Sequence, residues 1–158
     1  MGITMSRQSI SRVLTLMNHA NDDIENAVAE AYAEVGESVV KGIRDGSLSN
    51  WEDQTGALRS SVGYVVTRKG RIVKQSSFEV IRNGADGATK GRNLAEKLAN
   101  DFADRDFALI VVAGEEYAVY VEAVEGKAVL AQGQLYIEKN IPQLLRSRVR
   151  QVLDKYEK

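Results

Sequence analysis

An antiparallel hairpin is predicted from SSVGYVVTRKGRIV, residues 60–73. Its first part, residues 60–67, is rich in β-branched and aromatic side chains, which favour a strand. Residues 68–71 predict the turn, with Gly70 at its tip, because glycine accepts the backbone angles of a tight turn. The return strand is expected over about 72–81. We therefore expect a small antiparallel sheet in the middle of the chain.

A long helix is predicted before the hairpin. Apolar side chains recur every three or four residues from Ile10 to Ile43, which places them on one face of a helix. Ser6 or Ser9 can cap its start, and Gly46 can end it in the left-handed conformation. At about 1.5 Å per residue this helix would be about 50 Å long, longer than a compact domain of this size. It must therefore break near residues 21–23 or project at one end.

A mobile loop and a short helix are predicted after the hairpin. Residues 83–91 hold three glycines among polar side chains, so few contacts would restrain them. Leu94, Leu98 and Phe102 then recur every four residues, which predicts a helix over about 92–104.

The C-terminal part completes an α+β plan. Residues 107–113 form a continuous apolar run, which predicts a buried central strand. Residues 117–122 fit either a strand or a helical face. The last helix is expected from Leu130 onwards, with Pro142 starting or kinking a turn. We predict one domain over residues 1–158: a long N-terminal helix, a small antiparallel sheet, and a short middle helix and a C-terminal helix packed on one face.

Composition limits the kind of protein. A chain of 158 residues is about one ordinary domain. It has no cysteine, which excludes disulfides, thiolate metal sites and a cysteine nucleophile. Its 21 basic and 22 acidic side chains nearly cancel, which argues against a dedicated nucleic-acid binder. No apolar run is long enough for a membrane span, and the first residues lack the apolar core of a signal peptide, so we expect a soluble intracellular product without membrane partners.

No residue set predicts catalysis or metal binding. His19 is the only histidine, whereas a metal site needs several converging ligands. The acidic pairs at 22–23 and 115–116, together with Glu122, could supply a metal site or an acid–base pair. Their spacing does not support this, so we favour a solvated helix face for the first pair and a turn for the second. We expect no catalytic residues, no metal and no cofactor.

Four basic residues cluster at the hairpin: Arg68, Lys69, Arg71 and Lys74. Such a cluster could touch nucleic-acid phosphates. The ordinary explanation is solubility and protection of a sheet edge from stray pairing. We favour the ordinary explanation, because the net charge of the chain is near zero.

Two segments, WEDQTGALRSSV at 51–62 and YAVYVE at 117–122, resemble the tail-completion or head–tail joining (neck) family of tailed bacteriophages. That family has a Thr-Gly-x-Leu-Arg-x-Ser element after an N-terminal helix and a Tyr-Ala-x-Tyr-Val-Glu element before a C-terminal one. The resemblance covers about residues 8–156. The matching residues here are Thr55, Gly56, Leu58, Arg59, Ser61, Tyr117, Ala118, Tyr120, Val121 and Glu122.

The first of these segments has a plain structural meaning. Thr55 can cap a short turn, Gly56 permits a tight bend, Leu58 can fill the core and Ser61 can open the strand. The sequence after Glu122 departs from the family pattern, so the related virion-morphogenesis proteins stay open as an alternative.

The resemblance implies a non-enzymatic structural protein of the virion, made in the host cytoplasm and assembled into a ring, with a hexamer favoured. It implies neighbouring connector or tail proteins as partners, and the basic hairpin would line the DNA lumen or face such a neighbour. A sheet edge and the long N-terminal helix are the candidate surfaces for ring contacts. The alternative is a binding module of a mobile element that touches nucleic acid through residues 68–74.

Overall fold

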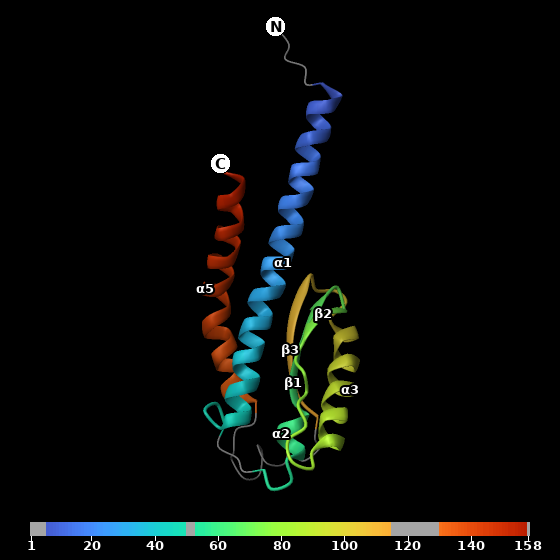
Figure 1. Ribbon diagram of the computed structural model, residues 1–158, viewed down its shortest axis with the longest axis vertical. Helices are drawn as coiled ribbons and strands as arrows, with labels where there is room; N and C mark the ends of the chain where they lie inside the picture. The colour runs from blue at the N-terminus through green and yellow to red at the C-terminus, as the bar shows by residue number, and fades with distance from the viewer. Residues whose placement is uncertain (1–5, 50–52, 115–129, 158) are drawn as a thin grey trace.

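The computed structural model describes residues 6–49, 53–114 and 130–157, and it confirms the predicted α+β class (Figure 1). A small antiparallel sheet lies between helices. In chain order the elements are α1 (Arg7–Asp45), α2 (Ala57–Ser61), β1 (Val62–Arg68), β2 (Arg71–Gln75), α3 (Ala85–Asp101), β3 (Phe107–Ala113) and α5 (Ala131–Tyr156).

Helix α1 is continuous, and both of its predicted ends are confirmed. The Ser6 hydroxyl accepts a hydrogen bond from the Ser9 N–H at 3.1 Å, which satisfies one of the free amides of the first turn. Gly46 ends the helix with a φ of 88°, the left-handed conformation that glycine adopts without strain. The helix does not break near residues 21–23. Its N-terminal end instead projects beyond the rest of the domain (Figure 1).

The sheet has the strand order β2-β1-β3, and both pairings are antiparallel. Lys69 and Gly70 form the predicted hairpin turn with φ values of 49° and 78°, as a two-residue turn of this twist requires. The central position of 107–113 was predicted wrongly, because β1 is central and β3 is an edge strand. The return strand also ends at Gln75 and not at 81, and Phe78, in the segment that follows, has a positive φ of 43° that a strand does not allow.

Helices cover both faces of the sheet, so the expectation that they pack on one face was wrong. Side chains of a strand alternate between faces. Val62 and Val66 of β1 pack with α1, whereas Val65 packs with α3. Because β1 is apolar toward both sides, each side needs a helix. Helix α5 packs on α1 and lies away from α3 (Figure 1).

Helix α3 begins earlier than predicted, and the mobile loop at 83–91 was a wrong prediction. Residues 85–91 form the first turns of the helix. A Cβ atom at Gly87 would lie 2.1 Å from the carbonyl oxygen of Ala57, and one at Gly91 would lie 2.2 Å from that of Ser61. These glycines therefore allow α3 to approach the backbone of α2 closely, and they are not a sign of mobility.

Helix α5 confirms the predicted C-terminal helix and keeps Pro142 inside it. Its apolar side chains pack against the core face of α1. Two polar contacts fix its outer half: Arg148 donates to Glu34 at 2.6 Å, and the Tyr156 hydroxyl donates to Asp23 at 2.9 Å. In the part of the chain that the structure describes, no helix has the length and apolar character of a membrane span.

Candidate functional site

The first segment of the resemblance folds into a capped turn and the short helix α2. Gly56 has a φ of 86°, and the Thr55 hydroxyl accepts a hydrogen bond from the Ala57 N–H at 3.2 Å. Leu58 is 1% exposed and belongs to the core. The predicted roles of these three residues are confirmed. Ser61 differs, because it closes α2 by donating its hydroxyl to the Leu58 carbonyl at 2.8 Å, and the strand opens at Val62.

Asp53 holds this turn together, and the sequence analysis missed it. Its carboxylate accepts hydrogen bonds from the N–H groups of Gly56 and Arg59, both at 2.9 Å. Free amides at the start of a helix attract such an acceptor. Arg82 adds a contact by donating to the carbonyl oxygen of Asp53 at 3.0 Å. An aspartate shortly before a Thr-Gly turn was the available signal.

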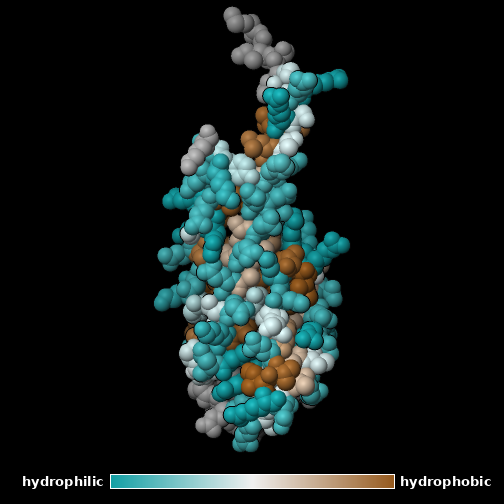
Figure 2. Space-filling view, viewed as in Figure 1, coloured by the Kyte–Doolittle hydropathy of each residue, from teal (hydrophilic) through white to brown (hydrophobic). Residues whose placement is uncertain are grey.

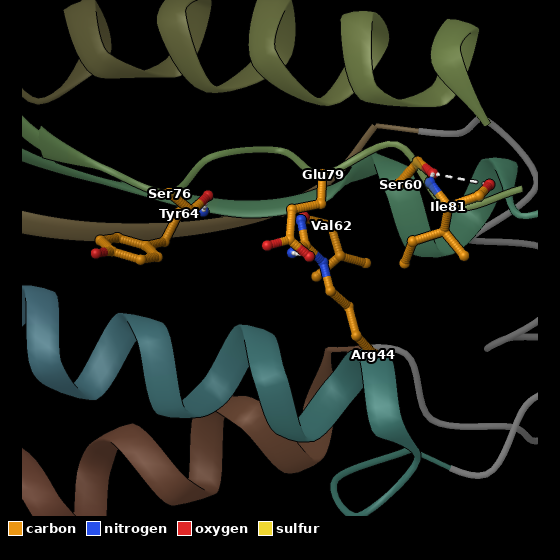
Figure 3. Close-up of polar contacts among 7 residues, drawn as sticks. All are labelled: Arg44, Ser60, Val62, Tyr64, Ser76, Glu79 and Ile81. Carbon is orange, nitrogen blue, oxygen red and sulfur yellow. Dashed lines mark hydrogen bonds and ion pairs between the residues drawn. The ribbon is translucent and has the colours of Figure 1, made fainter.

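Two buried serines replace strand pairing beside β1 (Figure 3). The Ser60 hydroxyl accepts a hydrogen bond from the Ile81 N–H at 2.8 Å. The Ser76 hydroxyl accepts one from the Tyr64 N–H at 2.9 Å, and the Ser76 N–H donates to the Tyr64 carbonyl at 2.9 Å. Side chains thus satisfy the backbone after β2 has ended.

Arg44 links the end of α1 to the start of β1 (Figure 3). Its guanidinium donates to the Val62 carbonyl at 2.7 Å and lies 3.8 Å from the Glu79 carboxylate. Burial lowers the pKa of Arg44, and the charges of Glu79 and Glu37 oppose that change. This largely buried hydrogen bond from Arg44 to the Val62 carbonyl therefore joins α1 to β1.

The structure divides the basic hairpin into two paired and two unpaired residues. Arg68 forms an ion pair with Glu25, and Lys74 forms one with Glu30, both on α1. Lys69 and Arg71 are exposed at the tip, and neither has an ion-pair partner within residues 6–49, 53–114 and 130–157. The four residues therefore do not form one continuous free basic face. The acidic partners lie more than 40 positions away in the sequence, so spacing could not reveal them.

The second segment of the resemblance, Tyr117, Ala118, Tyr120, Val121 and Glu122, lies outside the described residues, as does the acidic pair at 115–116. Among the residues that are described, no group of three or more metal-ligating side chains converges.

A further surface is the projecting end of α1, where all side chains from residue 6 to 19 are exposed. Figure 2 shows apolar side chains on this end of the molecule. Hydrophobic periodicity alone could not separate this surface from the core, because the same pattern continues into the buried part of α1. Its large apolar side chains, with their exposed fractions, are Ile10 (46%), Val13 (46%), Leu14 (55%), Leu16 (54%) and Met17 (62%).

Comparison with known proteins yields no relative. No family model, no curated protein and no solved structure matches this chain.

Proposed function

We propose that this chain is a non-enzymatic structural protein of a tailed bacteriophage, which completes the tail or joins the head to the tail. It would act as a ring, with a hexamer favoured, between neighbouring connector and tail proteins of the virion. The observation that carries the proposal is the ordered pair of segments at 51–62 and 117–122, set between an N-terminal and a C-terminal helix.

The geometry of the first segment supports a structural role for it. Leu58 is 1% exposed, and Ser60 and Ser61 are fully buried. Leu58 packs in the core with α1 and β1, and the Ser60 hydroxyl accepts the Ile81 N–H, so these side chains fix the position of α2. A motif of this kind preserves the shape of a domain that must fit its neighbours in an assembly.

A ring contact joins two different surfaces of the same chain. Strand β2 is one candidate, because all five of its residues are exposed and it lies at the edge of the sheet. An exposed edge can pair with the backbone of a neighbouring subunit. A stable contact would bury on the order of 800 Å² per partner.

The hairpin tip is the proposed contact to DNA in the lumen or to an adjoining tail component. Lys69→Glu with Arg71→Glu reverses the two unpaired charges and leaves the Arg68–Glu25 and Lys74–Glu30 ion pairs in place. We expect an intact fold and a reduced yield of infectious particles.

The matched control is Arg92→Glu with Lys97→Glu, which makes the same charge change on the exposed face of α3. A full yield of infectious particles from the hairpin variant would contradict the proposed contact of the hairpin tip with DNA or an adjoining tail component. A virion map without this chain at the neck or tail would remove the whole proposal.

The second candidate is a nucleic-acid binding module that uses residues 68–74, and the exposed tip favours it. The logarithm of DNA affinity falls with the logarithm of salt concentration with a slope of about −0.9 per phosphate contact. Two unpaired cations predict a slope no steeper than about −2 from the hairpin. A submicromolar affinity with a slope near −2, lost in the Lys69→Glu, Arg71→Glu variant, would favour this candidate over the structural one.

A further inference from the structure

Helix α1 continues past the end of its partner helix. The Tyr156 hydroxyl at the end of α5 reaches Asp23 of α1, and Val28 lines a groove with residues of α5. Beyond that point α1 projects from the domain (Figure 1), and the side chains of residues 6–19 are all exposed. At about 1.5 Å per residue, residues 6–20 amount to about 22 Å of helix without a neighbour in the described structure.

This projecting end carries an apolar stripe. Ile10, Val13 and Met17 follow one another at steps of three and four, and Ala20 and Ile24 continue the series. Steps of this size keep the side chains on one face of a helix. The same face leads to Val28, which α5 flanks. A helix of this length has little stability in water unless its apolar face is covered. The stripe is thus the continuation of a helix–helix interface beyond the end of one helix.

We propose that the stripe is covered by the same segment of a second copy of this chain, packed antiparallel about a two-fold axis. The apolar positions are self-complementary. Ile10 and Ala20 lie five residues on either side of Thr15, and Val13 and Met17 lie two residues on either side. In an antiparallel pair centred at Thr15, Ile10 therefore meets Ala20 of the other copy, and Val13 meets Met17. Alternating steps of three and four are those of a helix–helix seam.

Charge sets the direction of the pair. Arg7 and Arg12 are the only charged residues between positions 6 and 21, and the acidic stretch 22–25 follows directly. An antiparallel pair brings the basic end of each helix toward the acidic stretch of the other. A parallel pair would bring basic residues against basic ones and acidic against acidic, which is unfavourable.

The position of α5 excludes the parallel direction as well. Helix α5 lies along the striped side of α1 from Asp23 onwards. In a parallel pair the partner helix would run into α5 at that level. In an antiparallel pair the two domains lead away from each other.

This inference does not rest on the proposed phage function. The helix pair is isologous and closes after two copies, whereas a ring contact is heterologous. The pair leaves the β2 edge free, so both contacts could exist in one assembly, and each can fail without the other.

Sedimentation equilibrium of the full chain tests the pair. We expect a reversible monomer–dimer equilibrium in the micromolar range, because the two paired segments are short and would bury less surface area than a standard protein–protein interface. Val13→Glu should weaken the dimer at least about tenfold, which is on the order of 1.4 kcal/mol. The matched control is Thr15→Glu, which adds the same charge on the opposite face and should leave the dimer within about twofold of the unmodified chain. Both variants should keep the circular dichroism spectrum, since both positions are exposed.

A monomer at all concentrations, or a dimer that survives Val13→Glu, would overturn the inference. A monomer that binds phosphatidylserine vesicles through the stripe would overturn it too, in favour of a membrane surface.

Cross-linking tests the direction, because the chain has no cysteine of its own. Mixing the Val13→Cys and Met17→Cys chains should give a disulfide-linked heterodimer under mild oxidation. Ile10→Cys alone should not cross-link, since the two copies of residue 10 would lie about 15 Å apart along the axis, beyond disulfide reach. Efficient self-cross-linking of Ile10→Cys would mean a parallel pair and would overturn the inference.

Discussion

At the scale of single residues, Ser76 completes the backbone hydrogen bonding of β1. Its hydroxyl accepts the Tyr64 N–H, and its side chain is buried. Ser76→Ala would leave that amide buried without a partner, so we expect a loss of about 1–3 kcal/mol in the free energy of unfolding. Urea denaturation of the variant and the unmodified chain measures this loss. Ser77→Ala, at an exposed neighbouring position, should change the stability by less than about 0.5 kcal/mol; equal effects at both positions would contradict this role.

Tyr64 gives the fold a dependence on alkaline pH. Burial raises the pKa of its phenol, and the charge of Glu37 raises that pKa further. The folded pKa thus lies above the unfolded value of about 10. This contribution to stability is fully present below pH 10 and is lost as pH rises through the folded pKa. The near-ultraviolet absorbance of the unmodified chain and of Tyr64→Phe is titrated with alkali. The difference between the two curves reports the ionisation of Tyr64, and its midpoint should lie above about pH 10. A midpoint at or below that value would mean that the phenol is solvated.

Within elements, the glycines of α3 have opposing effects: they lower the helix propensity of α3, and they allow it to pack closely on α2. Gly87→Ala would ordinarily stabilise a helix by up to about 1 kcal/mol. Here the new Cβ would meet the Ala57 carbonyl oxygen at 2.1 Å. We therefore expect a net loss of about 1–3 kcal/mol in unfolding free energy, because α3 and α2 must move apart. Thermal unfolding shows whether Gly87→Ala is less or more stable than the unmodified chain. Thr89→Ala, on the exposed side of α3, should be neutral or stabilising; a stabilised Gly87→Ala chain would refute the packing role.

The elements that the sequence predicts well are those with local signals. Ser6 and Gly46 mark the ends of α1 by their own chemistry, and Gly70 marks the hairpin turn. The start of α3 could not be predicted, because a glycine that allows close packing looks the same in sequence as one in a loop. The strand order could not be predicted either, since it depends on which strands meet in three dimensions.

In the candidate site too, local contacts could be predicted from the sequence and contacts between distant residues could not. The roles of Thr55, Gly56 and Leu58 follow from neighbouring residues and are confirmed. The ion pairs of the hairpin with Glu25 and Glu30 join distant parts of the chain, and no spacing rule predicts them.

For the molecule as a whole, the pairing of the first helix with the last one has a consequence during synthesis. Helix α1 is made before α5, which spans residues 131–156. Chains are made from the N-terminus, and contacts between distant segments form late. The α5-facing side of α1 therefore stays uncovered until residues 131–156 have left the ribosome.

Stalled ribosome–nascent chain complexes of increasing length test this order. We expect proteases to cleave α1 readily in every chain that ends before residue 131, and protection of residues 24–45 to appear only once α5 is free to pack. Early protection of α1 would show that the sheet alone suffices to shield it. A premature stop between residues 114 and 130 would accordingly leave the α5-facing side of α1 exposed, in a chain whose three described strands have all been made.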